Sequence, residues 1–323
     1  MILETGLDAR IPRRRSLPLG LAALLVLGAA GCGSSSSGRG SASTTTAATT
    51  SNTAPVSSSA TGSTSSLVAQ GSLDLLTYNV AGLPQGLSSS NPVANTPQIS
   101  PKLNAYAVVL AQEDFTYHTQ LMSQALHPYQ SSPQPVSSVL RPMNDGLNRF
   151  SQPPFSGHQR VTWAVSYGVF GHANDSLASK GYSFARHELA PGVEVDVYNL
   201  HADAGSSQGD MDARLQQFAQ LAQDMATRSA GRPVIVAGDT NLKDTRPQDM
   251  QTLADFLGVL GLRDCARELG KPELIDRVMI RDGGGVFLTP SLWRTADEFV
   301  DAQGGDLSDH KAVHVTLDWA FYR

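Results

Sequence analysis

The chain has little cysteine and no excess of basic residues. Only two cysteines, Cys32 and Cys265, occur among its 323 residues. A disulfide-rich scaffold is therefore excluded, and the fold must be stable through a core that 41% hydrophobic residues can supply. The formal net charge of -5 argues against a surface that grips nucleic acid phosphates by charge alone. A nuclease is not excluded, because a bound metal can supply positive charge locally.

Residues 1–31 have the layout of an export signal. Four arginines precede an apolar stretch over residues 17–27, and small residues follow it. The stretch is too short to span a bilayer comfortably. Residues 29–32 resemble a bacterial lipoprotein cleavage box, in which Cys32 becomes the acylated first residue. We expect an exported protein, lipid-anchored to a membrane of the bacterial cell envelope; the alternative is a secreted protein whose cysteine is incidental.

Residues 32–71 consist almost entirely of Ser, Thr, Ala and Gly. Such a segment buries too little to offset its ordering entropy, so we predict a flexible tether. Removal of residues 1–31 takes away four Arg and two acids and leaves 20 basic and 27 acidic residues, a net charge of -7. The folded domain is predicted over residues 72–323.

One acid and one amide follow a clear buried strand. Residues 234–237 are an apolar run that suits a strand buried on both faces, and Gly238 permits a sharp turn. Asp239 and Asn241 follow, and residues two apart in an extended chain point to the same side. The two side chains would then face one spot, although ordinary turn chemistry also explains this stretch alone.

Polar side chains occur at other predicted strands in the same way. They are Asn79 near the end of 73–80, Glu113 at the end of 107–113, His201 after a hairpin over 180–200, Asp276 within 274–280, and Asp309 with His310 before 312–317. Each has a bland explanation by itself. Together they supply oxygen ligands for a hard cation such as Mg²⁺ and an imidazole for proton transfer, which phosphoester hydrolysis needs.

The connecting segments favour helices and turns. Residues 210–228 form the clearest amphipathic helix, and a second helix starts at Pro247. A Ser/Asn/Pro-rich loop is expected after the first strand, with a short helical piece around residues 101–106. Residues 283–285, three glycines, are most simply a hairpin turn.

The order and spelling of these segments resemble the endonuclease/exonuclease/phosphatase superfamily, whose relatives include DNase I and bacterial neutral sphingomyelinases. The matching segments are Tyr-Asn-Val (78–80), Gln-Glu (112–113), Asn-Leu-His (199–201), Gly-Asp-Thr-Asn (238–241), Ile-Asp-Arg-Val (275–278) and Ser-Asp-His (308–310). The resemblance covers residues 72–323. It implies an α+β fold, a four-layer α/β/β/α sandwich of two packed mixed sheets with the site at one edge.

The resemblance also implies a metal site. Glu113 would be the main ligand of Mg²⁺ or of another divalent cation such as Mn²⁺. Asn79 would lie close to both the metal and the phosphate of the substrate. Asp309 would complete the metal side.

The remaining residues would act on the substrate. Asp239 would position or deprotonate the attacking water, and Asn241 would hydrogen-bond the phosphate. His201 would bind and stabilise the pentacovalent centre. His310 would act as general base or as a transition-state donor, oriented by Asp276.

We therefore expect a monomeric, Mg²⁺-dependent phosphodiesterase. The acidic balance and the membrane tether favour a phospholipid-type substrate slightly over nucleic acid, and a surface nuclease of the same family is the alternative. An idle site that serves only for binding is a second alternative.

A third, a serine hydrolase, rests on the sequence around Ser183, which should occupy a strand-to-helix elbow but falls in a predicted hairpin. No obvious aromatic hairpin tip for insertion into a bilayer is present. Four apolar residues lie in roughly the right region, but core packing explains them as easily: Phe287, Leu288, Trp293 and Phe299.

Overall fold

The computed structural model describes residues 65–136, 142–168 and 178–323. The predictions for the export signal, for Cys32 and for the tether as far as residue 64 lie outside the described residues. Among the helices that are described, none is long and apolar enough to cross a membrane.

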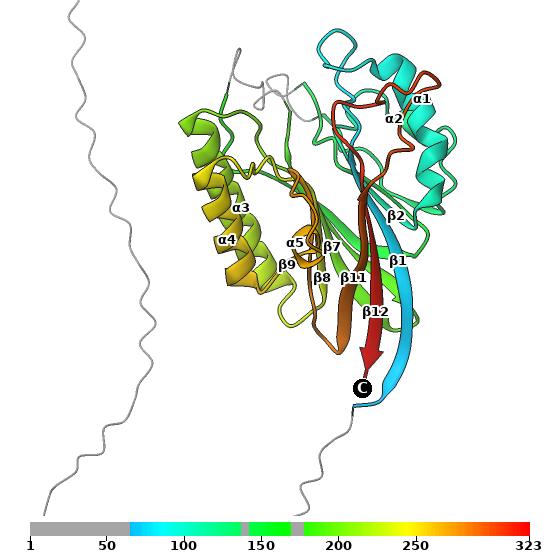
Figure 1. The fold of residues 1–323 in the computed structure, drawn as a ribbon, viewed down its shortest axis with the longest axis vertical. Coiled ribbons are helices and arrows are strands. Elements are labelled where there is room, and N and C mark those ends of the chain that lie inside the picture. The colour runs from blue at the N-terminus through cyan, green and yellow to red at the C-terminus, as the bar shows by residue number, and fades with distance from the viewer. Residues whose placement is uncertain (1–64, 137–141, 169–177) are drawn as a thin grey trace, which may run out of the picture. The chain divides into compact units, whose positions relative to one another are not determined.

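Two six-stranded sheets form the centre of the domain (Figure 1). The first has the order β11-β12-β1-β2-β4-β3 and comprises β1 (Leu67–Asn79), β2 (Val108–Gln112), β3 (Tyr129–Gln130), β4 (Asn148–Ser151), β11 (Val286–Thr295) and β12 (Val313–Tyr322). The second has the order β5-β6-β7-β8-β10-β9 and comprises β5 (Phe155–Thr162), β6 (Gly181–Ala190), β7 (Val193–His201), β8 (Val234–Asp239), β9 (Arg263–Asp264) and β10 (Asp276–Arg281). Both sheets are mixed, because β1–β2 and β7–β8 pair in parallel and their other pairs are antiparallel.

Helices cover the outer face of each sheet. The second sheet packs against α3 (Gln208–Arg228) and α4 (Pro247–Leu260), whose apolar stripes join one cluster with β6 to β8. The first packs against α1 (Pro92–Lys102), the 3-10 helix η1 (Leu103–Ala105) and α2 (His118–Met122). A short helix, α5 (Cys265–Glu268), follows β9. The predicted four-layer α/β/β/α sandwich is confirmed.

Capping explains where the two long helices begin and end. Ser207 and Asp210 form a reciprocal capping box at the start of α3, which satisfies two backbone N–H groups. Helix α4 begins at Pro247, whose fixed φ suits a first turn, and ends before Gly261 at φ 63°. Both predicted helices are therefore confirmed close to their expected bounds.

The side chains between the sheets change from apolar to polar along the strands. In β1, Leu73 and Leu75 lie in the inter-sheet core, and Thr77 and Asn79 continue the same column because side chains alternate along a strand. The same change occurs in β2 (Leu110 to Gln112), β7 (Val197 to Asn199 and His201), β8 (Ala237 to Asp239) and β10 (Val278 to Asp276). One end of the space between the sheets is therefore apolar, and the other end collects polar groups.

The folded domain begins earlier than predicted. Strand β1 starts at Leu67, inside the segment expected to be a tether, and Leu67 pairs with Tyr322 of β12. Leu67 and Val68 are both exposed and show no alternating buried pattern, so the sequence does not mark this strand, which is held by hydrogen bonds to the distant β12.

Two local expectations were wrong. The segment predicted as a Ser/Asn/Pro-rich loop contains α1, which begins at Pro92 in its first turn, carries Pro97 and Pro101 inside it, and buries Ile99 against the first sheet. Residues 283–285 do form a turn, with Gly283 N donating to Val286 O at 3.0 Å. This turn carries the chain from β10 in the second sheet to β11 in the first, so it does not close a hairpin within one sheet.

Candidate active site

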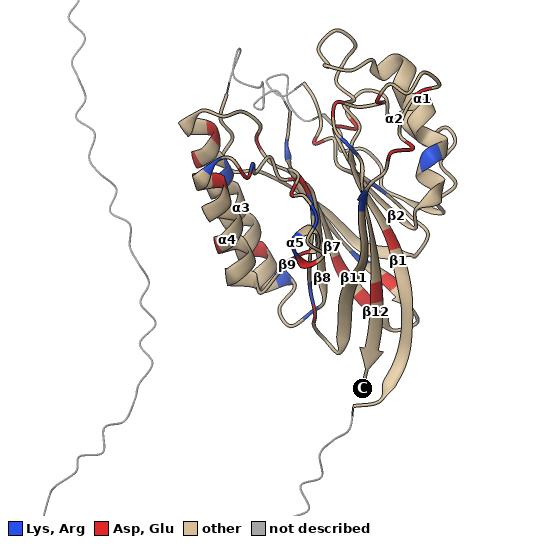
Figure 2. Cartoon of the chain, in the orientation of Figure 1, with Lys and Arg blue, Asp and Glu red and all other residues tan. Residues whose placement is uncertain are grey.

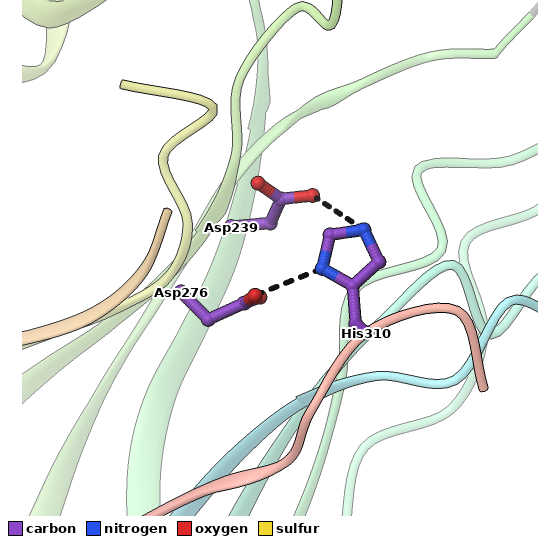
Figure 3. Close-up of side chains that lie close together, drawn as sticks. All are labelled: Asp239, Asp276 and His310. Carbon is purple, nitrogen blue, oxygen red and sulfur yellow. Dashed lines mark hydrogen bonds and ion pairs between the residues drawn. The ribbon is translucent and has the colours of Figure 1, made fainter. Parts of the chain in front are cut away.

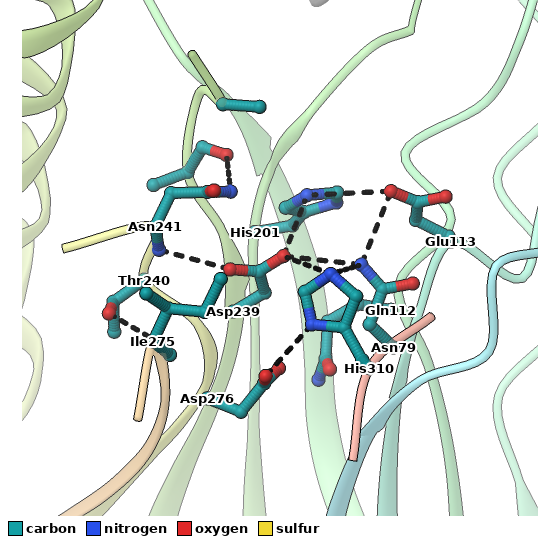
Figure 4. A network of polar contacts seen from close by, with 12 residues as sticks. Asn79, Gln112, Glu113, His201, Asp239, Thr240, Asn241, Ile275, Asp276 and His310 are labelled. Atoms are coloured by element: carbon teal, nitrogen blue, oxygen red, sulfur yellow. Dashed lines mark hydrogen bonds and ion pairs between the residues drawn. The ribbon is translucent and has the colours of Figure 1, made fainter. Parts of the chain in front are cut away.

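The polar end of the two sheets gathers residues from the ends of five strands and from the turn before β12 (Figure 4). Strand pairing explains part of this arrangement, because His201 lies opposite Asp239 in the β7–β8 register and Asp239 lies opposite Asp276 in the β8–β10 register. Asn79 and Glu113 come from the ends of β1 and β2 in the other sheet. The site therefore spans both sheets.

Asn79 connects the residues from the two sheets. Its Nδ2 lies 3.2 Å from Oε1 of Glu113, 3.2 Å from Oδ2 of Asp239 and 3.5 Å from Nε2 of His310. Its Oδ1 accepts a hydrogen bond from the backbone N–H of Ala81 at 3.0 Å. Asn79 is fully buried, so one amide fixes two carboxylates and one imidazole around a common point.

Asp239 is the central carboxylate. Its Oδ2 lies 3.3 Å from Nε2 of His201 and 3.7 Å from Nε2 of His310, and its Oδ1 accepts a hydrogen bond from the backbone N–H of Asn241 at 3.0 Å. Burial alone would raise the pKa of this carboxyl, but the two imidazoles outweigh burial and hold the pKa below its ordinary value. Asp239 is therefore ionised at neutral pH.

His310 is held between two carboxylates (Figure 3). Its Nδ1 lies 2.8 Å from Oδ2 of Asp276, which leaves Nε2 pointing towards Asp239. Burial by itself would lower the pKa of the imidazole, but the charges of Asp276 and Asp239 outweigh it and raise the pKa. The backbone N–H of His310 donates to Oγ of Ser308, and that hydroxyl donates to the Asn79 carbonyl at 2.7 Å. The Ser-Asp-His segment is thus tied to the end of β1.

His201 and Asn241 complete the second-sheet side of the site. Nε2 of His201 is 3.9 Å from Oε1 of Glu113, and its Nδ1 has no hydrogen-bond partner among the described residues. Nδ2 of Asn241 donates to the Ala202 carbonyl at 3.1 Å. Both side chains are buried at the same strand ends as Asp239.

Backbone strain is concentrated here. Within the described residues, positive φ occurs at only three residues other than glycine: Ala81 (50°), Glu113 (55°) and Asn241 (51°). All three follow strands that end at the site, and such strained conformations persist where the surroundings over-determine them. Gly82 approaches the Glu113 carbonyl so closely that a Cβ would lie 2.4 Å from that oxygen. The backbone around Glu113 is therefore tightly constrained.

The metal-ligand residues expected from the sequence are only partly together. Glu113 and Asn79 are adjacent, but Asp309 is exposed and accepts a hydrogen bond from Ser89 Oγ. In the described chain no hydrogen bond or ion pair joins Asp309 to either of the other two. Ligand atoms of Asp239, Asp276 and His310 lie within 4.8 Å of one another and form an acidic/His cluster that could hold an ion.

The donor set fits a hard divalent cation. The carboxylates of Glu113 and Asp239 converge on the Asn79 amide, and the Glu113 side chain is 19% exposed. Oxygen donors with room for water are what Mg²⁺ prefers.

The sequence did not single out Lys180. This residue is buried just before β6, and its charge contributes to the lowered pKa of Asp239. The pairing of β6 with β7 brings it to this edge, since Tyr182 lies opposite Leu200. A single lysine before a strand belongs to no recognisable motif, so only the pairing of β6 with β7 shows that Lys180 lies near the site.

A cavity of about 300 Å³ opens beside the Asp276–His310 pair. Its apolar wall includes Leu242 and Ile275, and Lys243 and Asp244 also line it.

Two expectations about other residues were also settled. Ser183 lies in the middle of β6, is fully buried, and accepts a hydrogen bond from Nη2 of Arg149 at 2.9 Å, so the serine hydrolase alternative is wrong. Leu288, Trp293 and Phe299 are core residues, whereas Phe287 is 50% exposed and packs edge-on against Tyr322.

Comparisons with known proteins agree with this geometry. No protein-family model matches the chain. Sphingomyelinases of Mycobacterium bovis and Mycobacterium tuberculosis are 34% identical to it over 276 residues, which cover 79% of this chain and 54% of theirs. The chain thus spans about half the length of these curated relatives.

Three solved structures are similar in fold. Beta toxin from Staphylococcus aureus, a mutant with bound magnesium ions, has a TM-score of 0.57 at 18% identity and covers 76% of this chain and 99% of its own. TDP2 from D. rerio, complexed with single strand DNA product, has a TM-score of 0.59 at 18% identity, with coverage of 76% and 98%. An endonuclease/exonuclease/phosphatase from Beutenbergia cavernae has a TM-score of 0.52 at 16% identity, with coverage of 76% and 71%.

Carboxylates, amides and two histidines at one edge of a four-layer sandwich define a DNase I-like protein. The chain has the DNase I-like fold of the endonuclease/exonuclease/phosphatase superfamily, as its motifs indicated, and over the matched region it is a homologue of sphingomyelinases.

Proposed function

We propose that this protein is a metal-dependent phosphodiesterase. The observation that carries the proposal is the ionised Asp239 carboxylate, which lies within 3.7 Å of the Asn79 amide, His201 and His310. The carboxylate can accept a hydrogen bond from the attacking water, and the neighbouring N–H groups can hold the phosphate whose phosphorus atom the water attacks. Homology to sphingomyelinases supports phosphoester hydrolysis as the reaction.

Each residue has a place in this reaction. Glu113, with Asn79 beside it, would hold Mg²⁺ or Mn²⁺, which would supply positive charge against the phosphoryl oxygens. Asp309, on the exposed turn before His310, would have to leave its hydrogen bond to Ser89 to join them. Asp239 orients the water, and His310 accepts the water's proton in those molecules in which its ring is neutral, a fraction that grows as the pH rises. The Asp276 carboxylate fixes the His310 ring so that Nε2 faces this point. His201 and Asn241 donate hydrogen bonds to the phosphoryl oxygens as charge builds on them.

The substrate class follows from the relatives and from charge. The homologous sphingomyelinases favour a phospholipid-type diester, and the proposed lipid anchor on Cys32 would keep the domain close to a membrane that contains one. TDP2, with its single strand DNA product, keeps a nuclease as the second candidate. In the cartoon of Figure 2, the Lys and Arg positions are spread over several elements, and the formal net charge of -5 does not favour a phosphate backbone. The phospholipid is therefore our first choice.

Removal of divalent metal is expected to stop hydrolysis. We expect the rate with bis-nitrophenyl phosphate or sphingomyelin to fall by at least about 100-fold in excess chelator and to recover with added Mg²⁺, because the cation offsets several kcal/mol of developing charge. The measurement is product release from these two substrates and from plasmid DNA, with and without chelator. Cleavage of DNA but not of sphingomyelin would establish the nuclease, and binding without any hydrolysis would establish an idle site. Hydrolysis that is indifferent to chelator would rule out the metal.

Substitution of Asp276 is expected to shift the pH profile. A His310 base with a raised pKa loses its proton only at higher pH, so the acid limb of kcat/KM should lie above the ordinary histidine value of 6.5. The variant Asp276→Asn removes the charge that raises this pKa, so the limb should move to lower pH by about 1 to 3 units. An acid limb that stays in place in this variant would show that His310 is not the titrating group.

A further inference from the structure

One layer of buried polar side chains separates the apolar core from the site. We call it the Gln112 layer; it consists of Thr77 in β1, Gln112 in β2 and Asn199 in β7, all of which are inaccessible to solvent. Gln112 and Asn199 belong to the Gln-Glu and Asn-Leu-His segments that pointed to the superfamily, yet neither has a part in the reaction described above.

The Gln112 layer hydrogen-bonds one sheet to the other. Nε2 of Gln112, in the first sheet, donates to Oδ1 of Asn199, in the second sheet, at 2.7 Å and also contacts Oγ1 of Thr77 at 3.1 Å. Nδ2 of Asn199 donates to the backbone carbonyls of Ala111 at 2.9 Å and Asn148 at 3.2 Å. Asn199 therefore reaches across the interface and binds the ends of β2 and β4 directly.

The hydrogen bonds of the Gln112 layer can fix the position of one sheet relative to the other, which apolar packing alone cannot. The layers below contain Val, Leu and Ala, whose contacts are non-directional and tolerate small shifts of one sheet over the other. Hydrogen bonds weaken steeply with misalignment, so the bonds of the Gln112 layer fix the separation and register of the sheets at this level. Leaving any of these buried groups unpaired costs free energy, so the layer tolerates little displacement of one sheet relative to the other.

Each member of the layer is next to a site residue. Gln112 directly precedes Glu113, Thr77 lies two positions before Asn79, and Asn199 lies two positions before His201. The reaction requires Asn79 and Glu113 of one sheet to face His201 and Asp239 of the other. We propose that Gln112 and Asn199 are positioning residues that set the distance across the active site. This inference rests on the function proposed above.

The test compares Asn199→Leu and Gln112→Leu with a control, Val195→Ala, which weakens the same inter-sheet core two layers deeper in β7. We expect either leucine variant to lower kcat by about 100-fold, the effect of a misplacement of about 1 Å, with little change in KM. The rise in Tm caused by Mg²⁺ should also shrink, and this readout needs no substrate. The control should lower Tm while it keeps the wild-type kcat and the wild-type response to Mg²⁺.

Each outcome decides between positioning and simple stability. If the leucine variants match Val195→Ala in kcat and in the Mg²⁺ response, the layer only stabilises the fold and the proposal is overturned. If Asn199→Leu does not fold, Asn199→Asp replaces it, since it keeps the acceptor for Gln112 and loses both donors to the first sheet. If wild-type protein hydrolyses no diester but the Mg²⁺ response still separates the leucine variants from the control, the proposed function fails and the positioning role stands.

Discussion

Replacement of Asp239 by asparagine is expected to lower kcat by about 1,000- to 10,000-fold, because it removes the one anion that can order and activate the water. The substitution preserves size but turns an acceptor into a partial donor that faces Nδ2 of Asn79 and Nε2 of His201, both 3.3 Å away or closer. Diester hydrolysis under saturating substrate and Mg²⁺ measures the effect.

The matched control is Asp255→Asn on the exposed face of α4, where the carboxylate accepts a hydrogen bond only from Gln251 in the described structure. This variant should keep the wild-type rate. Thermal unfolding of both variants separates loss of activity from loss of fold. A rate within tenfold of wild type for Asp239→Asn would remove Asp239 from the centre of the reaction.

Replacement of His310 by glutamine is expected to lower kcat by about 1,000-fold. Glutamine can still hydrogen-bond Asp276, but it has no ring nitrogen that can lose and take up a proton at any pH. The Nε2 position that faces Asp239 and Asn79 then loses its proton acceptor. Steady-state rates across pH 5 to 10 measure both the loss and the disappearance of the acid limb.

The chain offers a second His–Asp pair as a control. Nε2 of His314, on β12, lies 2.8 Å from Oδ1 of Asp74, which matches the His310–Asp276 pair in distance but lies outside the candidate site. His314→Gln should leave kcat unchanged. Equal losses in the two glutamine variants would indicate a general effect on stability rather than proton transfer by His310.

Much of the candidate site could be predicted from the sequence, and the reason is the alternation of side chains along strands. Asp239 and Asn79 each end an apolar strand. If both strands are buried, these two side chains are expected at the polar end of the sheets. Asp309 shows the limit of this reasoning, because it precedes β12 in an exposed turn whose direction depends on contacts such as that with Ser89. Strand order could not be predicted either, since the Gly283 turn gives no sign that it passes from one sheet to the other.

The Gln112 layer illustrates a different limit. Gln112 and Asn199 are 87 residues apart, and neither has a spacing that marks a contact between them. Only the packing of the two sheets brings their amides within 2.7 Å. Long-range polar contacts of this kind depend on tertiary structure, whereas the period-two pattern that identified the strands is local.

The pairing of β1 with β12 has a practical consequence for experiments. Ser66 and Arg323 exchange both backbone hydrogen bonds, at 2.7 and 3.1 Å, at the end of the first sheet where the C-terminus is marked in Figure 1. Asn79 lies at the far end of β1, and 13 residues of strand extend about 40 Å. An affinity tag, a dye or a sensor-chip linkage joined at Arg323 would therefore start from the side remote from the candidate active site and leave that site accessible.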